Sequence, residues 1–105
     1  MNHYDTIILG GGPAGLTAGI YLSRAKLKTL VLNQGAIGGQ MVLTHEIANY
    51  PGVESISGYQ LANIMKNQAK SFGTKIKSLG EITELDLQST IKKVTIDLAE
   101  TFTAD

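Results

Sequence analysis

Three glycines at the spacing G-x-G-x-x-G are the residues of this chain whose type and spacing most directly indicate chemistry. Gly10 lets the chain turn tightly out of a strand, Gly12 lets the backbone approach a pyrophosphate, and Gly15 lets a helix pack close to that strand. The amide N–H groups that begin such a helix attract phosphate, and Pro13 suits its first position because proline has no N–H to leave unpaired. The alternative is a glycine-rich turn without a ligand, but the strand pattern before it and the helix pattern after it favour a phosphate-binding loop.

A second candidate cluster is Gly38-Gly39-Gln40. Two consecutive glycines expose backbone N–H groups and let a planar ligand approach closely, although such a pair is also common in ordinary loops. The Gln40 amide both donates and accepts hydrogen bonds, which suits the edge of a flavin ring. Thr44 and Asn49 offer further polar contacts, although each alone is more typical of a loop residue that satisfies its own backbone.

Asn33 and Gln34 stand where dinucleotide-binding units usually carry an acidic residue, roughly 20 positions after the glycine loop, that holds a ribose. An amide can still bond a ribose hydroxyl, but it lacks the charge that strengthens such a bond. An amide at this position therefore makes NAD a weaker candidate for the ligand, whereas it is little evidence against a flavin cofactor. The other interpretation of Asn33 is that it opens a turn.

Other residue types exclude several kinds of site. The chain has no cysteine, which excludes a disulfide scaffold, a thiolate metal site and a thiol redox step on this chain itself. His45 has no second metal ligand at useful spacing, so we interpret it as a solvated loop residue. The formal net charge is zero and the lysines are dispersed, so we expect no nucleic-acid or membrane partner. The N-terminus lacks the regions of a signal peptide, and we expect a cytoplasmic protein.

The elements that position these residues alternate between strand and helix. Residues 6–9, 13–24 and 28–32 have the patterns of a strand, a helix and a strand, which together predict a right-handed βαβ unit of a parallel sheet. Residues 33–57 predict an irregular segment, and a segment of this length inside a compact domain is usually functional.

A second helix is expected to begin with Ser57 as its N-cap, because Ser57 and Gln60 have the spacing of a capping box, and to end at Gly73. The strands expected after it span residues 74–77, 81–87 and 93–98, with a turn over 88–90.

In the last of these strands, Val94, Ile96 and Leu98 alternate with polar residues, so these three side chains are expected to face a core. Residues 101–105 predict neither a helix cap nor a domain end. A chain of 105 residues is one domain at most, so we expect an α/β architecture that is incomplete at its C-terminus. Such a chain is a fragment, or it is completed by another chain.

Four segments, in their order and spacing, resemble the N-terminal FAD-binding segment of the thioredoxin reductase family. They are the glycine loop 10–15, Gly38-Gly39-Gln40-Met41, His45-Glu46-Ile47-Ala48-Asn49-Tyr50-Pro51-Gly52 and Ser57-Gly58. The E-x-x-N-Y-P-G run is far more specific than the glycine loop. The resemblance implies a Rossmann-like FAD-binding domain, with a parallel βαβ sheet plus a small β meander, of which residues 1–105 form the N-terminal part.

The resemblance also implies which residues hold FAD. They are Gly10, Gly12, Pro13, Ala14, Gly15, Asn33, Gln34, Gly38, Gly39, Gln40, Thr44, Asn49 and Ile82. The glycine-loop members would hold the pyrophosphate, and residues 33–40 would wrap the ribose and diphosphate. Gln40, Thr44 and Asn49 would lie toward the ribityl chain and flavin, while Ile82 would offer its backbone to the adenine.

In that family the enzyme is a homodimeric flavoprotein in which NADPH reduces FAD, and the flavin reduces a Cys-x-x-Cys pair that passes electrons to thioredoxin. The resemblance therefore implies FAD as cofactor, NADPH or NADH as donor in the parent protein, and a thioredoxin-like partner. The family's NAD(P)H-binding domain, cysteine pair and C-terminal FAD segment have no counterpart here, so this chain alone is not expected to perform the full reaction. The alternatives are a stand-alone nucleotide-binding module without catalysis, and a structural half-domain completed by a second chain.

Overall fold

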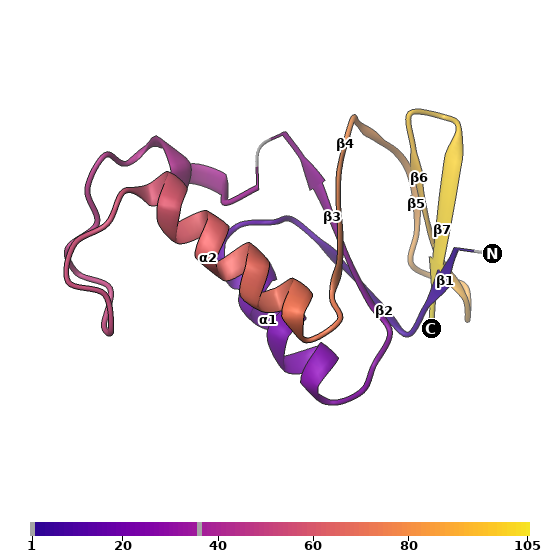
Figure 1. The fold of residues 1–105 in the computed structure, drawn as a ribbon. Helices are drawn as coiled ribbons and strands as arrows, with labels where there is room; N and C mark the ends of the chain where they lie inside the picture. The colour runs from indigo at the N-terminus through magenta and orange to yellow at the C-terminus, as the bar shows by residue number, and fades with distance from the viewer. Residues whose placement is uncertain (1, 36) are drawn as a thin grey trace.

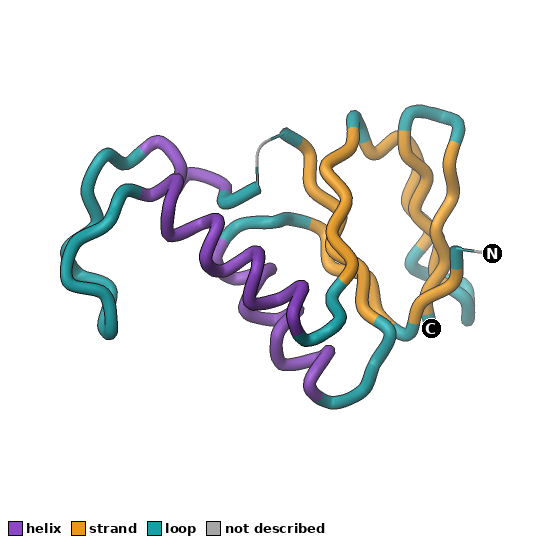
Figure 2. The backbone as a smooth tube through the Cα atoms, viewed as in Figure 1, coloured by secondary structure: helices purple, strands orange, loops and turns teal. Residues whose placement is uncertain are grey.

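A computed structural model describes residues 2–35 and 37–105, which fold into two β-sheets and two α-helices (Figures 1 and 2). The strands are β1 (His3–Tyr4), β2 (Thr6–Leu9), β3 (Thr29–Gln34), β4 (Lys75–Leu79), β5 (Ile82–Asp86), β6 (Lys92–Ile96) and β7 (Glu100–Ala104). The helices are α1 (Pro13–Arg24) and α2 (Gly58–Ser71), with a 3-10 helix η1 (Gly39–Leu43) between β3 and α2. None of the helices in these ranges is long and apolar enough to cross a membrane.

The first sheet is parallel, with strand order β2-β3-β4, and it confirms the predicted βαβ unit. In Figure 1 both helices lie on one side of this sheet, and β5, β6 and β7 lie on the other. Strand β3 is central and is covered on both faces, which explains its continuous apolar sequence. Leu30 and Leu32 pack in the core that faces the second sheet, while Val31 lies against α1 near Gly19.

Helix α2 begins as its sequence predicts. The Ser57 hydroxyl accepts a hydrogen bond from the backbone N–H of Gln60 (3.1 Å), and the Gln60 side chain accepts one from the backbone N–H of Ser57 (3.5 Å). These two bonds form a capping box, which satisfies donors that a helix start otherwise leaves unpaired. Leu61 and Met65 of this helix pack with Leu16 of α1 in the helical core.

The second sheet has the strand order β1-β7-β6-β5, with two strands that the sequence did not indicate and one that ends earlier than expected. Residues 101–105 predicted no element, but most of them form β7, which pairs antiparallel with β6 and parallel with β1. The short strand β1 was also not predicted, because two residues carry too little periodicity. The strand expected over residues 93–98 ends at Ile96, so Leu98 is 78% exposed and does not face a core.

The hairpin between β6 and β7 explains why that strand ends early. Asp97 and Leu98 have positive φ angles of 51° and 56°, and the N–H of Ala99 donates to the carbonyl of Ile96 (3.0 Å). Two central residues with positive φ are the signature of a type I′ turn, whose twist matches that of the strands. Strand β6 therefore ends at Ile96, although the alternation of the sequence continues to Leu98, because the chain reverses there to pair β6 with β7.

We expect Leu98→Gly to stabilise the chain, because glycine occupies positive φ without the steric cost that a branched residue has there. The free energy of unfolding should rise by roughly 0.5–1 kcal/mol in a urea titration. Ala99→Gly is the matched control: its φ is not positive, so the same added flexibility should give no gain. A Leu98→Gly chain no more stable than the parent would contradict the strain assigned to this turn.

Candidate functional site

Two glycines of the loop between β2 and α1 are required by the protein's own backbone. Gly10 has φ +121°, a conformation that other residues rarely adopt, and its N–H donates to the carbonyl of Leu32 (2.8 Å). A Cβ added to Gly15 would lie 1.9 Å from the carbonyl oxygen of Gly10, so α1 meets the strand end without room for any side chain. These observations match the turning and packing roles predicted for the first and third glycines of the motif.

Gly12 differs from both, because nothing in the described protein requires a glycine there. Its φ of −78° and ψ of −173° are open to any residue, and an added Cβ would have no heavy atom within 4 Å. Gly12 is the N-cap of α1 and is followed by Pro13 at the first helical position. Space beside a glycine that neither strain nor packing explains is what close approach of a ligand to the backbone requires.

The N-terminus of α1 offers amide donors beside this space. Among the hydrogen bonds of residues 2–35 and 37–105, none uses the N–H groups of Gly12, Ala14 or Gly15 as donor. The first helical N–H groups lack intrahelical acceptors, and the helix dipole adds a partial positive charge at the same end. This part of the site is therefore suited to a phosphate or another anion.

Gly11 links the glycine loop to the two segments that follow β3. Its N–H donates to Oδ1 of Asn33 (2.9 Å), and its carbonyl accepts from the N–H of Gly38 (2.7 Å). Nδ2 of Asn33 donates in turn to the carbonyl of Gly35 (2.9 Å). Asn33 is only 7% exposed, so the structure places this residue against the loop backbone; the ribose contact stays a prediction.

The Gly38-Gly39 pair packs directly on the glycine loop. Gly38 has φ +111°, and an added Cβ would lie 2.6 Å from the Cβ of Ala62 in α2. Gly39 has φ +61°, and a Cβ there would lie 3.4 Å from the Cα of Gly12. The structure thus brings the two predicted glycine clusters together at one end of α1.

Gln40, Thr44 and Asn49 lie on the segment that leads away from this junction, which projects from the body in Figures 1 and 2. Gln40 is in η1, and all three residues are exposed. No hydrogen bond recorded in the described ranges uses any of their side chains. Their predicted contacts with the ribityl chain and flavin therefore stay predictions.

Gln34 and Ile82 are joined at the carboxyl end of β3. Oε1 of Gln34 accepts a hydrogen bond from the N–H of Ile82 (3.2 Å), and the Ile82 side chain packs against the core between the sheets. This contact brings two predicted site residues together across the two sheets. The adenine contact predicted for Ile82 is not tested by it.

Gly11 is the residue of this site that the motif alone did not single out. A Cβ on Gly11 would lie 2.9 Å from Cδ1 of Ile37 and 3.0 Å from Cγ of Asn33, so a larger residue there would have to displace these two side chains. The sequence does contain an indication of this: Gly10 to Gly12 are three consecutive glycines, whereas the motif G-x-G-x-x-G allows any residue at position 11.

Titratable groups contribute little near this junction. His45 is exposed, and no cluster of three or more potential metal-binding side chains occurs within residues 2–35 and 37–105. The hydroxyl of Ser89, helped by backbone N–H groups, lowers the pKa of Asp86, the last residue of β5, which lies outside the junction. The electrostatics of the candidate site therefore come from backbone dipoles.

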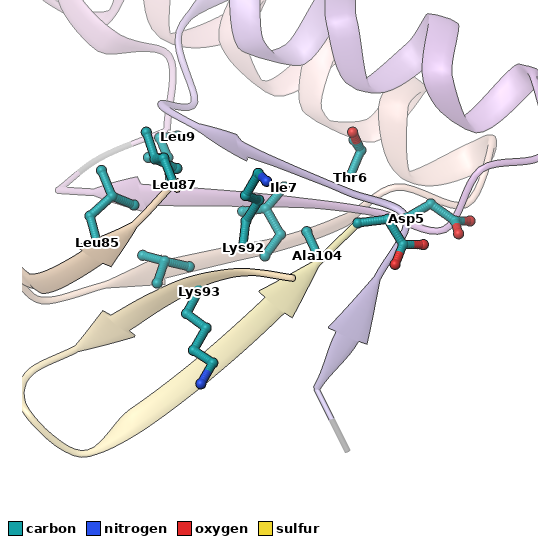
Figure 3. Close-up of a pocket in the computed structure, with 11 residues that line it drawn as sticks. Asp5, Thr6, Ile7, Leu9, Leu85, Leu87, Lys92, Lys93 and Ala104 are labelled. Carbon is teal, nitrogen blue, oxygen red and sulfur yellow. The ribbon is translucent and has the colours of Figure 1, made fainter. Parts of the chain in front are cut away.

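A separate groove lies between β2 and the second sheet (Figure 3). It has a volume of about 180 Å³ and contains none of the predicted cofactor-binding residues. Figure 3 shows Leu9, Leu85 and Leu87 gathered at one end and Asp5 at the other. Its wall follows the edge of β2 that pairs with no strand in the described ranges. Most of its exposed lining is apolar, and it includes none of the residues at the N-terminus of α1, so the groove is separate from the candidate anion site.

Comparison with known proteins shows which family this chain matches. A profile of the family described as pyridine nucleotide-disulphide oxidoreductase matches residues 4–105. The thioredoxin reductase of Peptoclostridium acidaminophilum is 45% identical over 100 residues, which are 94% of this chain and 31% of that protein. The thioredoxin reductase of Aquifex aeolicus is 52% identical over 96 residues, covering 90% of this chain and 29% of that protein.

Solved structures give the same result for the fold. Thioredoxin reductase from Giardia duodenalis superimposes with a TM-score of 0.92 at 38% identity, over 100% of this chain and 34% of that one. The enzyme from Gloeobacter violaceus gives a TM-score of 0.89 at 41% identity, over 97% and 32% of the two chains. The chain thus spans about a third of the length of the proteins that it matches.

Measurements of stability without a ligand can distinguish the role of Gly15 from that of Gly12. We expect Gly15→Ala to lower the free energy of unfolding by about 3 kcal/mol, because the added methyl overlaps the Gly10 carbonyl. Gly12→Ala should cost at most about 1 kcal/mol, the difference between glycine and alanine at an N-cap. Equal losses for the two variants in urea unfolding, without any ligand, would contradict the assignment.

Proposed function

Since this chain belongs to the pyridine nucleotide-disulphide oxidoreductase family and corresponds to the N-terminal segment of thioredoxin reductases, we propose that it is the FAD-binding portion of a flavin oxidoreductase. The observation that carries the proposal is the surroundings of Gly12. A glycine that neither φ nor packing explains lies at a helix N-terminus with unpaired amides, which is the arrangement a pyrophosphate requires.

In this proposal the chain's own groups bind and orient the cofactor. The N–H groups of Gly12, Ala14 and Gly15 hold the pyrophosphate, and Gly39 closes the loop from the other side. Gln40 meets the flavin with its amide, and Gln34 and Ile82 lie toward the adenosine. FAD, when bound, supplies the hydride and electron chemistry, while the protein supplies position and a polar environment.

The remaining reaction is assigned to the parent protein. We propose NADPH or NADH as the electron donor, a disulfide as the acceptor, a thioredoxin-like protein as partner, a homodimeric state and a cytoplasmic location. This chain has no cysteine, so the disulfide that accepts electrons from the flavin must lie outside these residues. The proposed share of this segment is cofactor binding.

The first experiment is a titration of the purified chain with FAD, followed by visible absorption and by quenching of flavin fluorescence. We expect saturable binding at one FAD per chain, with a shifted flavin spectrum. AMP or NAD bound in preference to FAD would identify a nucleotide module without a flavin. A chain that is folded by circular dichroism but binds no FAD would contradict the proposal for residues 1–105.

We expect Gly12→Val to abolish FAD binding while the chain stays folded, because the branched side chain would occupy the place of the pyrophosphate. Gly12→Ala should weaken binding less, since its single methyl fills less of the same space. FAD affinity and circular dichroism are measured on all three chains. A valine variant that binds FAD as tightly as the parent would remove Gly12 from the site.

Gln40→Leu is expected to change the flavin absorption spectrum and to weaken FAD binding several-fold, because it removes an amide that can bond the ring edge. Gln68→Leu makes the same exchange at an exposed position of α2 and serves as the control. Identical bound-flavin spectra for the parent and Gln40→Leu would place Gln40 away from the ring.

A further inference from the structure

We infer that Asn33 is a positioning residue of the phosphate-binding loop, acting through the Gly11 peptide and not through a contact with the cofactor's ribose. This inference rests on the proposed function, because it assigns how the loop of that site is held in its binding geometry. It concerns the residue at the end of β3 whose type differs from the usual acid of dinucleotide-binding units.

Both polar groups of the Asn33 amide are hydrogen-bonded to the backbone. Its Oδ1 accepts from the N–H of Gly11 and its Nδ2 donates to the carbonyl of Gly35, each at 2.9 Å. The residue is 7% exposed, and Gly11 packs so closely on it that an added Cβ would lie 3.0 Å from Cγ of Asn33. The side chain is therefore oriented along the protein backbone.

The peptide between Gly11 and Gly12 is planar, so fixing its carbonyl also fixes its N–H. The carbonyl of Gly11 accepts from the N–H of Gly38 at 2.7 Å, which fixes the plane of the peptide between Gly11 and Gly12. In a trans peptide the N–H and C=O point in opposite directions, so the N–H of Gly12 is directed away from Gly38. Asn33 and Gly38 thus hold Gly11 at its two ends and orient the donor that follows it.

The contacts at position 33 call for a side chain that both accepts and donates hydrogen bonds. One group must accept from Gly11 and donate to the Gly35 carbonyl, and a neutral amide does both. An ionised carboxylate has only acceptors, so it would face the Gly35 carbonyl with a repulsive contact and bring a buried charge. The amide at position 33 therefore fits the contacts of this structure better than the acid would.

The test compares FAD binding by the parent chain with that by Asn33→Leu, which keeps the volume of the side chain but leaves the Gly11 N–H without its acceptor. We expect FAD affinity to fall about tenfold or more, because the loop donors lose their fixed direction. Thr74→Val is the matched control: it also removes a buried side-chain hydrogen bond, to Ser23 and the Gly19 carbonyl, but outside the loop. It should leave FAD affinity within twofold.

A second measurement separates loop positioning from a ribose contact. Binding of ADP and of 2′-deoxy-ADP is measured by NMR titration on the parent and on Asn33→Leu, which leaves no polar group at position 33 for either role. If Asn33 acts on the loop, both ligands weaken by the same factor and the ratio of their dissociation constants is unchanged. If Asn33 holds the 2′-hydroxyl, the ratio moves toward one in the variant, and this outcome overturns the inference.

The outcomes distinguish this inference from the proposed function. If the parent chain binds neither FAD nor ADP, this result contradicts both the proposed function and the inference. A parent that binds FAD, together with an Asn33→Leu chain of equal affinity, leaves the proposed function intact and overturns the inference alone. In the folded parent the Gly11 amide should also exchange slowly with solvent, and this protection should disappear in Asn33→Leu.

Discussion

The close contact between helix α1 and the end of strand β2 is the constraint on which the rest of this structure depends. At Gly15 the helix meets the carbonyl of Gly10 with no room for a methyl group, and this contact sets where α1 begins. Because α1 begins there, its unpaired amides and its dipole are directed at the space beside Gly12. The same placement lets Leu16 pack with Leu61 and Met65, so the second helix depends on it as well.

Strand β3 contacts the other main parts of the structure. Its Leu30 and Leu32 belong to the core that holds the second sheet, whereas Val31 supports α1 on the opposite face. At its carboxyl end, Asn33 fixes the glycine loop and Gln34 holds the start of β5. One short strand thus connects the helical core, the sheet core and the candidate site, in accord with ligand sites at the carboxyl ends of parallel strands.

Sequence alone predicts those parts of the structure that local rules determine. The βαβ unit follows from its apolar runs and glycines, and the start of α2 follows from Ser57 and Gln60. The strands β1 and β7 could not be predicted in this way, because their pairing joins residues that lie far apart in the chain. Leu98 continues the alternation of β6, yet a hairpin reverses the chain before it. For Asn33, composition left two roles open, and only the positions of Gly11 and Gly35 showed which backbone groups it contacts.

The parallel pairing of β1 with β7 has a consequence for how the unit folds. His3 and Thr103 lie 100 positions apart, yet their side chains are hydrogen-bonded at 2.7 Å. The hairpin β6–β7 and the βαβ unit close short loops and can form early, whereas β1 must wait for a partner that the ribosome makes much later. Tyr4 therefore lacks its core neighbour Phe102 until the chain has been made that far. Because this pairing closes a longer loop than the other strand pairs of the described residues, we expect its formation to be the slow step in the assembly of the two sheets.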